Sequence, residues 1–142
     1  DVIEVQGEAD KIINQGMCER FHDLAKLDFG SGRAGISLFN AKARHFPYEL
    51  NMMERHPDGS QAFVPLSGTP MIVCVAADHN GTPASPRVFI SEPHQSINIH
   101  RNVWHGVLAP LENDGQYIVV DRIGEGPNLE EHWFAKTYTV SP

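Results

Sequence analysis

The sequence predicts an all-β protein built as a sandwich or barrel. Three observations support this class: segments with strand character recur between turns, Gly and Pro are frequent at those turns, and few windows hold a helical period. The 142 residues are enough to bury one core without disulfides. No heptad, long repeat, low-complexity tract or linker divides the chain, so we expect a single domain over residues 1–142.

The first clear strand follows the loop GSGRAG. In GISLFNAKA, residues 35–43, Ile36 and Leu38 alternate with smaller or polar side chains. Two further strands, QAFVPLSG and MIVCVAA, are separated only by a turn at Gly68 to Pro70. We therefore expect these two strands to pair as a hairpin.

The second half of the chain continues the pattern. DHNGTPASP, residues 78–86, has the composition of a surface loop, and the strand RVFI follows it. The turn NDG at 113–115 is expected to join GVLAPL and QYIVVDRI as a hairpin. GEGPNLEEHWF, residues 124–134, is expected to form a loop or a short helical turn, with Asn128 as N-cap for Leu129 to His132.

Composition excludes several classes of partner. The chain has eleven Lys and Arg against eighteen Asp and Glu, and it has no basic stripe. Nucleic acid is therefore not expected as a partner. The longest apolar run, Met71 to Ala77, is too short to cross a bilayer, and no membrane partner is expected. Cys18 and Cys74 show no metal or redox spacing. This favours a reducing compartment such as the cytoplasm, with a disulfide between the two as the alternative.

Two clusters concentrate side chains that can do chemistry. In MERHPDGSQAF, Glu54 and His56 point to the same face of an extended strand, and the turn after them can return Gln61 beside them. In NIHRNVWHGVL, His100 and His105 lie five residues apart and would face opposite sides of a regular strand. For both to line one cavity, the chain must bend near Arg101 and Asn102.

A histidine in a strand is often only structural, and four are expected at the surface, namely His22, His45, His79 and His94, while His132 is left open. The two clusters are different, because a barrel interior holding them without a metal, ligand or water would leave costly unpaired polar groups. Trp104 is expected in the core, with a pocket wall as the alternative.

Arginines are candidates for holding a substrate carboxylate. Arg87 and Arg101 can form bidentate pairs with a carboxylate, or lie at the surface. Arg122 follows Asp121 in a strand, so only one of them can face inward. No GxSxG, P-loop, HExxH or cysteine pair is present, so nucleophilic and nucleotide-dependent classes lose support and no organic cofactor is expected.

Three segments together strongly resemble the ureidoglycolate lyase family, formerly called hydrolases: MERHPDGSQAFVPLSG, QSINIHRNVWHGVLAPL and YIVVDRIGEGPNLEEHWF. The similarity runs from about Asp1 to Phe134. It implies a cupin-like double-stranded β-helix, a jelly-roll type barrel with few helical turns, usually homodimeric. The implied reaction converts (S)-ureidoglycolate to glyoxylate and urea in allantoin and purine catabolism. Family members usually begin upstream of DVIE, so a short N-terminal segment is expected before Asp1.

The wider cupin pattern, which this resemblance brings in, accounts for the two clusters. Glu54, His56, Gln61 and Gly68 fall at the positions of its first motif, and His100, Asn102 and His105 at those of its second. Glu54 replaces a histidine and Gln61 replaces a glutamate. The implied metal ligands are Glu54, His56, Gln61 and His105. Such a mixed set suits nickel or manganese, although an amide in place of a carboxylate weakens the hold.

Elimination of urea from a carbinol-urea needs a base, an acid and a group that holds the carboxylate. We expect His105 or His100 to take the hydroxyl proton and Glu54 or His56 to deliver a proton to urea. Matched to the second motif, His105 is the stronger candidate. The expected substrate-binding residues are Gln61, Arg87, Arg101, Trp104 and Arg122. Two alternatives stay open: an isomerase-like cupin acting on another small carboxylate or sugar, and a noncatalytic cupin that binds a small molecule.

Overall fold

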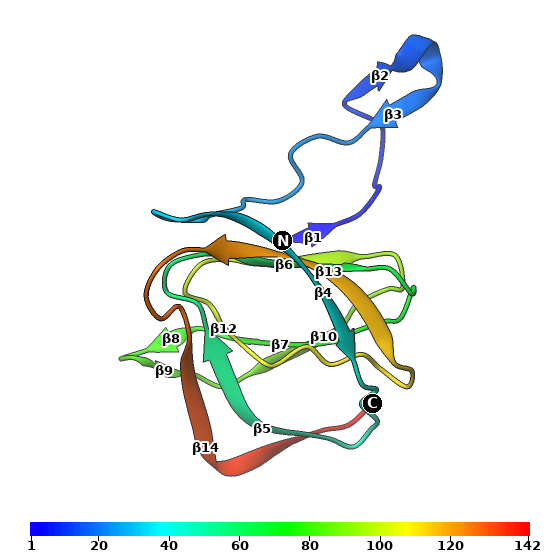
Figure 1. The fold of residues 1–142 in the computed structure, drawn as a ribbon. Coiled ribbons are helices and arrows are strands. Elements are labelled where there is room, and N and C mark those ends of the chain that lie inside the picture. The colour runs from blue at the N-terminus through cyan, green and yellow to red at the C-terminus, as the bar shows by residue number, and fades with distance from the viewer.

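The computed structural model describes residues 1–142 and is almost entirely β-structure, arranged as two antiparallel five-stranded sheets (Figure 1). The first sheet has the order β1-β11-β6-β13-β4. Its strands are β1 (Val2–Ile3), β4 (Arg33–Ala41), β6 (Gln61–Pro65), β11 (Ser96–Ile99) and β13 (Gly115–Ile123). The all-β, cupin-like fold class predicted from the sequence is confirmed.

The second sheet has the order β10-β7-β12-β5-β14. Its strands are β5 (Tyr48–Arg55), β7 (Ile72–Ala76), β10 (Arg87–Ile90), β12 (Trp104–His105) and β14 (Glu130–Val140). Two small hairpins lie outside these sheets. One joins β2 (Lys11–Ile13) and β3 (Cys18–Arg20) through the 3₁₀ turn η1 (Asn14–Gly16), and the other joins β8 (Asp78–His79) and β9 (Thr82–Pro83).

The core has two parts. One cluster joins residues of the first sheet with Val73 and Val75 of β7, so it fills the space between the sheets; its buried members are Phe63, Met71, Ile97, Ile99, Tyr117 and Val119. The other gathers on the second sheet; its buried members are Tyr48, Leu50, Met53, Ile72, Cys74, Ala76, Trp104 and Ala109. Trp104 is therefore a core residue, as predicted. Cys18 and Cys74 are both free thiols, and no helix is long and apolar enough to cross a membrane.

Both predicted hairpins are wrong. β6 and β7 belong to different sheets, so the turn at Gly68, which has φ of +66°, carries the chain across the barrel. Residues 106–111 make only isolated bridges, Met71 to Pro110 and Arg44 to Leu111, while β13 pairs with β4 and β6. Turn residues show where a chain changes direction, but they do not show which strand it will pair with.

The predicted helical turn near residue 129 is also wrong. β14 begins at Glu130, and its first residues alternate in exposure as a strand does. Asn128 does not cap a helix, because its Oδ1 accepts a hydrogen bond from the Asp58 backbone N–H at 2.7 Å. The predicted surface loop 78–86 is largely exposed and folds into the β8–β9 hairpin, with Asn80 and Gly81 both at positive φ.

Candidate metal centre and active site

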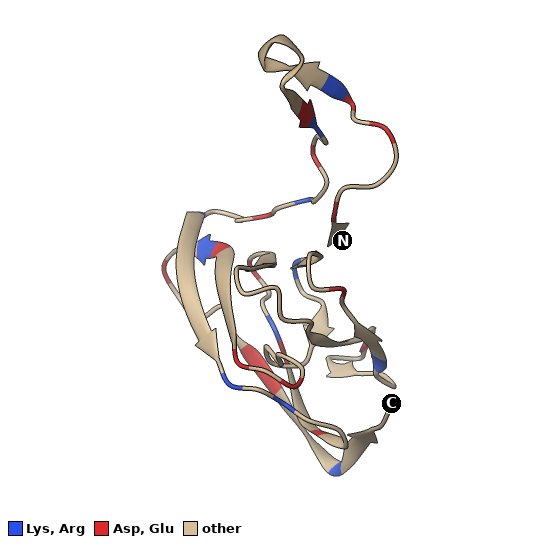
Figure 2. Cartoon of the chain, turned by 90° about the vertical axis from the view of Figure 1, so that its right-hand side faces the viewer, with Lys and Arg blue, Asp and Glu red and all other residues tan.

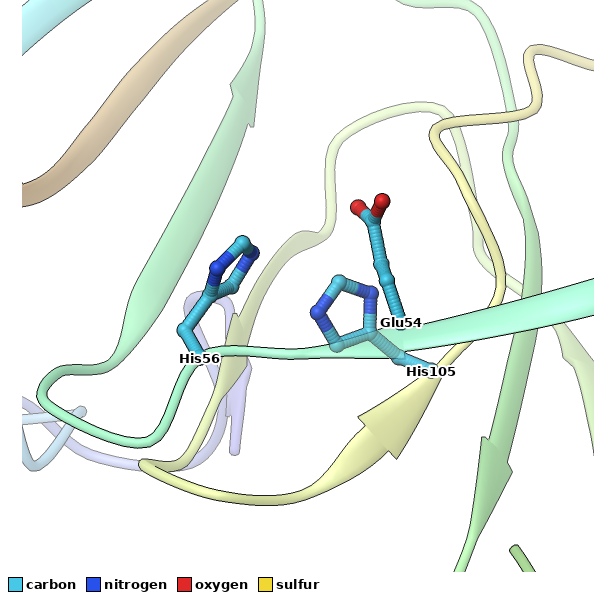
Figure 3. Close-up of side chains that lie close together, drawn as sticks. All are labelled: Glu54, His56 and His105. Atoms are coloured by element: carbon cyan, nitrogen blue, oxygen red, sulfur yellow. The ribbon is translucent and has the colours of Figure 1, made fainter. Parts of the chain in front are cut away.

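Three of the predicted site residues meet at one place on the second sheet. Glu54 lies in β5, His56 follows the end of that strand, and His105 lies in β12 directly opposite Glu54 in the ladder. Each offers one ligand atom, and these atoms lie within 4.8 Å of one another. Figure 3 shows the three side chains converging from these elements. We call this group the triad.

The predicted bend before His105 is confirmed. β11 ends at Ile99 in the first sheet and β12 begins at Trp104 in the second. Between them Asn102 has φ of +63°, a conformation that Asn tolerates better than most residues. The Asn102 backbone N–H donates to the His56 carbonyl at 2.9 Å, which ties the bend to the triad.

His105 presents an unpaired nitrogen to the triad. Its Nδ1 lies 3.0 Å from the Gly106 carbonyl and so donates to it, which leaves the lone pair of a neutral ring on Nε2. This Nε2 is buried without a hydrogen-bond partner. Burial, only partly opposed by the Gly106 hydrogen bond, lowers the pKa of His105 to about 4. The ring is therefore neutral at neutral pH, as a metal ligand or a proton acceptor must be.

His56 is oriented in the same way. Its Nδ1 lies 2.7 Å from the Asn128 carbonyl, and its Nε2 lies 3.2 Å from Gln61 Oε1. Gln61 is buried and reaches Asp121 through a long hydrogen bond of 3.4 Å from Nε2 to Oδ2. The Gln61 amide thus lies beside the triad, as the sequence predicted, and links His56 to a carboxylate.

Glu54 differs from an ordinary surface glutamate. Burial raises its pKa, the nearby His56 opposes this, and the Glu131 carboxylate adds to it. A carboxyl with a raised pKa can both release and take up a proton closer to neutral pH. His105 also lines a small cavity of about 20 Å³, which is otherwise lined mostly by apolar residues and has room for about one water.

Other candidates lie elsewhere. His100 is half-exposed, and its Nε2 lies 2.8 Å from Asp1 Oδ2 on the far side of the bend from His105. The four histidines predicted at the surface, His22, His45, His79 and His94, are all exposed. His132 of β14 packs edge-on against Trp104 and Phe134.

The candidate arginines are engaged away from the triad. Arg101 donates through Nε to the Pro57 carbonyl, and Arg122 donates through Nη2 to the Glu125 carbonyl. Arg87 lies over the ring of Phe89 at 5.1 Å. The structure thus brings together Glu54, His56, Gln61 and His105, and none of its hydrogen bonds or ion pairs joins these arginines to them.

A second polar cluster lies on the opposite face of β5 and β12, and sequence reasoning missed it. Arg55 pairs with Asp78 at 2.8 Å and with Glu130 at 2.6 Å, and its guanidinium lies 4.5 Å from the centre of the Trp104 ring. Trp104 Nε1 donates to Asp78 Oδ1 at 2.8 Å. The available signal was strand alternation, because Arg55 stands between Glu54 and His56 and must point away from them.

The residues present fit a divalent metal ion. Two imidazoles are each held by a backbone carbonyl through Nδ1, and a carboxylate lies within reach of both. Carbonyl partners of this kind orient histidines in metal sites. The buried, unpartnered Nε2 of His105 is the most direct sign, because such an atom is costly unless a ligand or ion satisfies it.

Comparisons with known proteins agree with the resemblance drawn from the motifs. The family model described as ureidoglycolate lyase matches residues 1–141. A ureidoglycolate lyase of Rhodobacter capsulatus is 58% identical over 93% of this chain and 83% of its own length. Relatives from Chelativorans sp. and Rhizobium meliloti, named ureidoglycolate lyase and ureidoglycolate lyase 2, are each 46% identical over 99% of this chain and over 86% and 87% of their own lengths.

Proposed function

The chain belongs to the ureidoglycolate lyase family, and we propose that it cleaves ureidoglycolate to glyoxylate and urea. The observation that carries this proposal is the triad, which places a carboxyl of raised pKa beside two imidazoles on a scaffold that the family model matches over residues 1–141. It is therefore a carbon–nitrogen lyase.

The reaction moves one proton within the substrate. The hydroxyl on the central carbon loses its proton, the C–O bond becomes a carbonyl, and the C–N bond breaks. The urea nitrogen receives both the electron pair of that bond and one proton. The two products together hold all the atoms of the substrate, so no water or redox partner is consumed, and one group that accepts and returns a proton is sufficient.

We assign that proton transfer to Glu54. A carboxylate can be ionised at the start of the reaction and protonated midway through it. Its carboxylate has two oxygens, so it can face the triad and still meet the substrate. This differs from the sequence-based expectation that His105 or His100 removes the proton, because His105 is oriented as a ligand and His100 pairs with Asp1 outside the triad.

We propose that Glu54, His56 and His105 hold a divalent ion, nickel or manganese, with Gln61 beside it. When bound, such an ion supplies positive charge to the carboxylate and hydroxyl oxygens of the substrate. Two observations support this assignment: the free Nε2 of His105, and the engagement of Arg87, Arg101 and Arg122 with other groups.

A coupled assay of urea and glyoxylate from racemic ureidoglycolate tests the function. We expect equal amounts of both products, from the (S)-enantiomer only, and loss of activity on chelation with recovery when nickel or manganese is returned. Metal analysis of the purified protein checks the ion separately. Absence of urea release from metal-loaded, folded protein would contradict the proposal and favour an isomerase or a binding protein in the same barrel.

The family resemblance also supports three proposals about setting. We propose that the protein works in allantoin and purine catabolism, in the cytoplasm, as a homodimer. The two free thiols agree with a reducing compartment. Size-exclusion chromatography with light scattering measures the dimer, and fractionation of the source cells checks the compartment.

A further inference from the structure

The N-terminal segment stands apart from the barrel. Residues 5–24, which we call the arm, contain the β2–β3 hairpin and extend away from the two sheets in the views of Figures 1 and 2. At its base Gln95 donates to Glu4 at 2.9 Å, while β2 and β3 pack against each other and η1. The arm is thus anchored at its base and has few contacts with its own barrel.

An isolated hairpin of this size is not stable in water by itself. Two-stranded hairpins are marginal unless a third strand or another surface covers them, and these strands have only three residues each. The arm also exposes large apolar side chains, the most exposed being Met17 at 86%. The other exposed apolar residues are Val5, Ile12 and Leu24. The arm therefore presents apolar surface that the rest of this barrel leaves uncovered.

A matching surface lies on the first sheet. Side chains on the water-facing side of an antiparallel sheet should be polar. Here Ile36 and Leu38 of β4 are exposed by 76% and 64%, and their cross-strand neighbours on the same face are Val120 and Ile118 of β13. With Val64 opposite Ile118, these residues form one apolar patch, which we call the outer face. A contiguous, partly exposed apolar patch on a sheet face is typical of an interaction site.

The charges of the two surfaces are complementary. The arm has four acidic residues against two basic ones: Glu8, Asp10, Glu19 and Asp23, with Lys11 and Arg20. At one end of the outer face, Arg122 follows Val120 on the same side of β13 and has no carboxylate partner, because its Nη2 donates to the Glu125 carbonyl. An acidic, apolar arm and an apolar face edged by an arginine without a carboxylate partner thus occur on the same chain.

We infer that the arm of each molecule packs on the outer face of a second copy, and that the reverse contact forms at the same time. Exchange of identical elements about a two-fold axis covers both surfaces with a closed interface and leaves no arm free. This assigns the surface through which the proposed dimer forms and is independent of the proposed reaction.

Dissociation constants of full-length variants test the interface. Ile36→Glu places a charge in the apolar contact and faces an acidic arm, so we expect the dimer dissociation constant to rise at least about 100-fold. Met17→Glu on the arm should have a similar effect. Trp133→Glu is the matched control, because Trp133 is 63% exposed on β14 of the other sheet, and it should leave the constant unchanged. Circular dichroism establishes that each variant is folded.

The native cysteine of the arm gives a second measurement. Cys18 is partly exposed, whereas Cys74 is buried and burial raises its thiol pKa to about 11, so a nitroxide reagent will label Cys18. Spin-labelled protein is mixed with ¹⁵N-labelled Cys18→Ser protein. We expect line broadening at the amides of β4 and β13 in the ¹⁵N-labelled copy.

Three results would overturn the inference. They are a monomeric wild-type protein at micromolar concentration, an Ile36→Glu protein that dimerises normally, and a dimer broken by Trp133→Glu instead. Broadening confined to other surfaces of the ¹⁵N-labelled copy would also contradict it. Because none of these measurements involves urea or glyoxylate, their failure is distinct from failure of the proposed reaction.

Discussion

The polar residues on the two faces of β5 and β12 differ in whether their hydrogen-bonding groups have partners. On one face Arg55 and Trp104 are fully engaged, with Asp78 and Glu130 completing a closed set of ion pairs and hydrogen bonds. On the other face His105 keeps an unpartnered buried nitrogen, and burial raises the pKa of Glu54. Satisfied polar groups stabilise a fold, whereas a buried unsatisfied one needs a partner such as a ligand, an ion or a water. Residues adjacent in sequence thus point in opposite directions: those on one face stabilise the fold, and those on the other are available to a ligand.

The largest effect is expected on the unsatisfied face. His105→Ala removes a ligand atom from the triad, and we expect turnover to fall by about 10²- to 10⁴-fold and bound metal to be lost. Steady-state release of urea and metal analysis measure the two effects. Near-normal turnover in a folded, metal-containing His105→Ala protein would remove His105 from the site.

Truncation on the satisfied face should cost stability instead. Trp104→Ala empties a core position, and we expect a loss of about 3–5 kcal/mol in the free energy of unfolding. Urea denaturation measures this loss. The control is Trp133→Ala, which removes the same side chain from an exposed position and should cost less than about 1 kcal/mol. Equal losses from the two substitutions would contradict the assignment of Trp104 to the core.

The depressed pKa of His105 makes stability depend on pH. The folded ring has a pKa of about 4 against 6.5 in the unfolded chain, so the unfolded state binds the proton first as pH falls. The stability contributed by His105 is present above pH 6.5 and is lost between there and pH 4, to a total of roughly 3 kcal/mol. Denaturation of chelator-treated protein at both ends of this range measures it. Over the same pH range, the free energy of unfolding of the His105→Gln protein should fall by roughly 3 kcal/mol less than that of the wild type.

The smallest effect is expected at His100, the other histidine of NIHRNVWHGVL. His100 is half-exposed and pairs with Asp1, so His100→Gln should change stability by less than about 1 kcal/mol and turnover by less than about threefold. A loss of turnover as large as that of His105→Ala would return His100 to the catalytic group. Kinetics of the two variants side by side decide between the histidines.

Local sequence patterns predicted the strands and the site better than they predicted the pairing of strands. Two-residue spacing placed Glu54 beside His56, and the need for both motifs to meet predicted the bend that Asn102 makes. The turns at Gly68 and Asp114 carried no information about partners, because the same turn chemistry serves a hairpin and a crossing between sheets.

Other contacts were beyond the reach of sequence. The carbonyls of Gly106 and Asn128 fix the two imidazoles, but a backbone carbonyl has no residue type to signal it. Asn128 was predicted to start a helix, because Asn side chains often accept hydrogen bonds from backbone N–H groups there. Here the N–H group belongs to Asp58, which is not in a helix. Arg55 and Asp78 lie 23 residues apart and meet only after β5 and β8 are placed by the fold.

β12 has only two residues, yet it occupies the middle of the second sheet, between β7 and β5. So short a strand is the natural place for the sheet to open transiently. An ion held by Glu54 and His105 would span the β5–β12 seam and bind only its closed form. At about 100 times its dissociation constant, the ion should slow amide hydrogen exchange through that opening about 100-fold. The Asn102 amide, which donates to the His56 carbonyl just beyond the end of β5, is the natural reporter. The bound ion would then also hold β5 and β12 together.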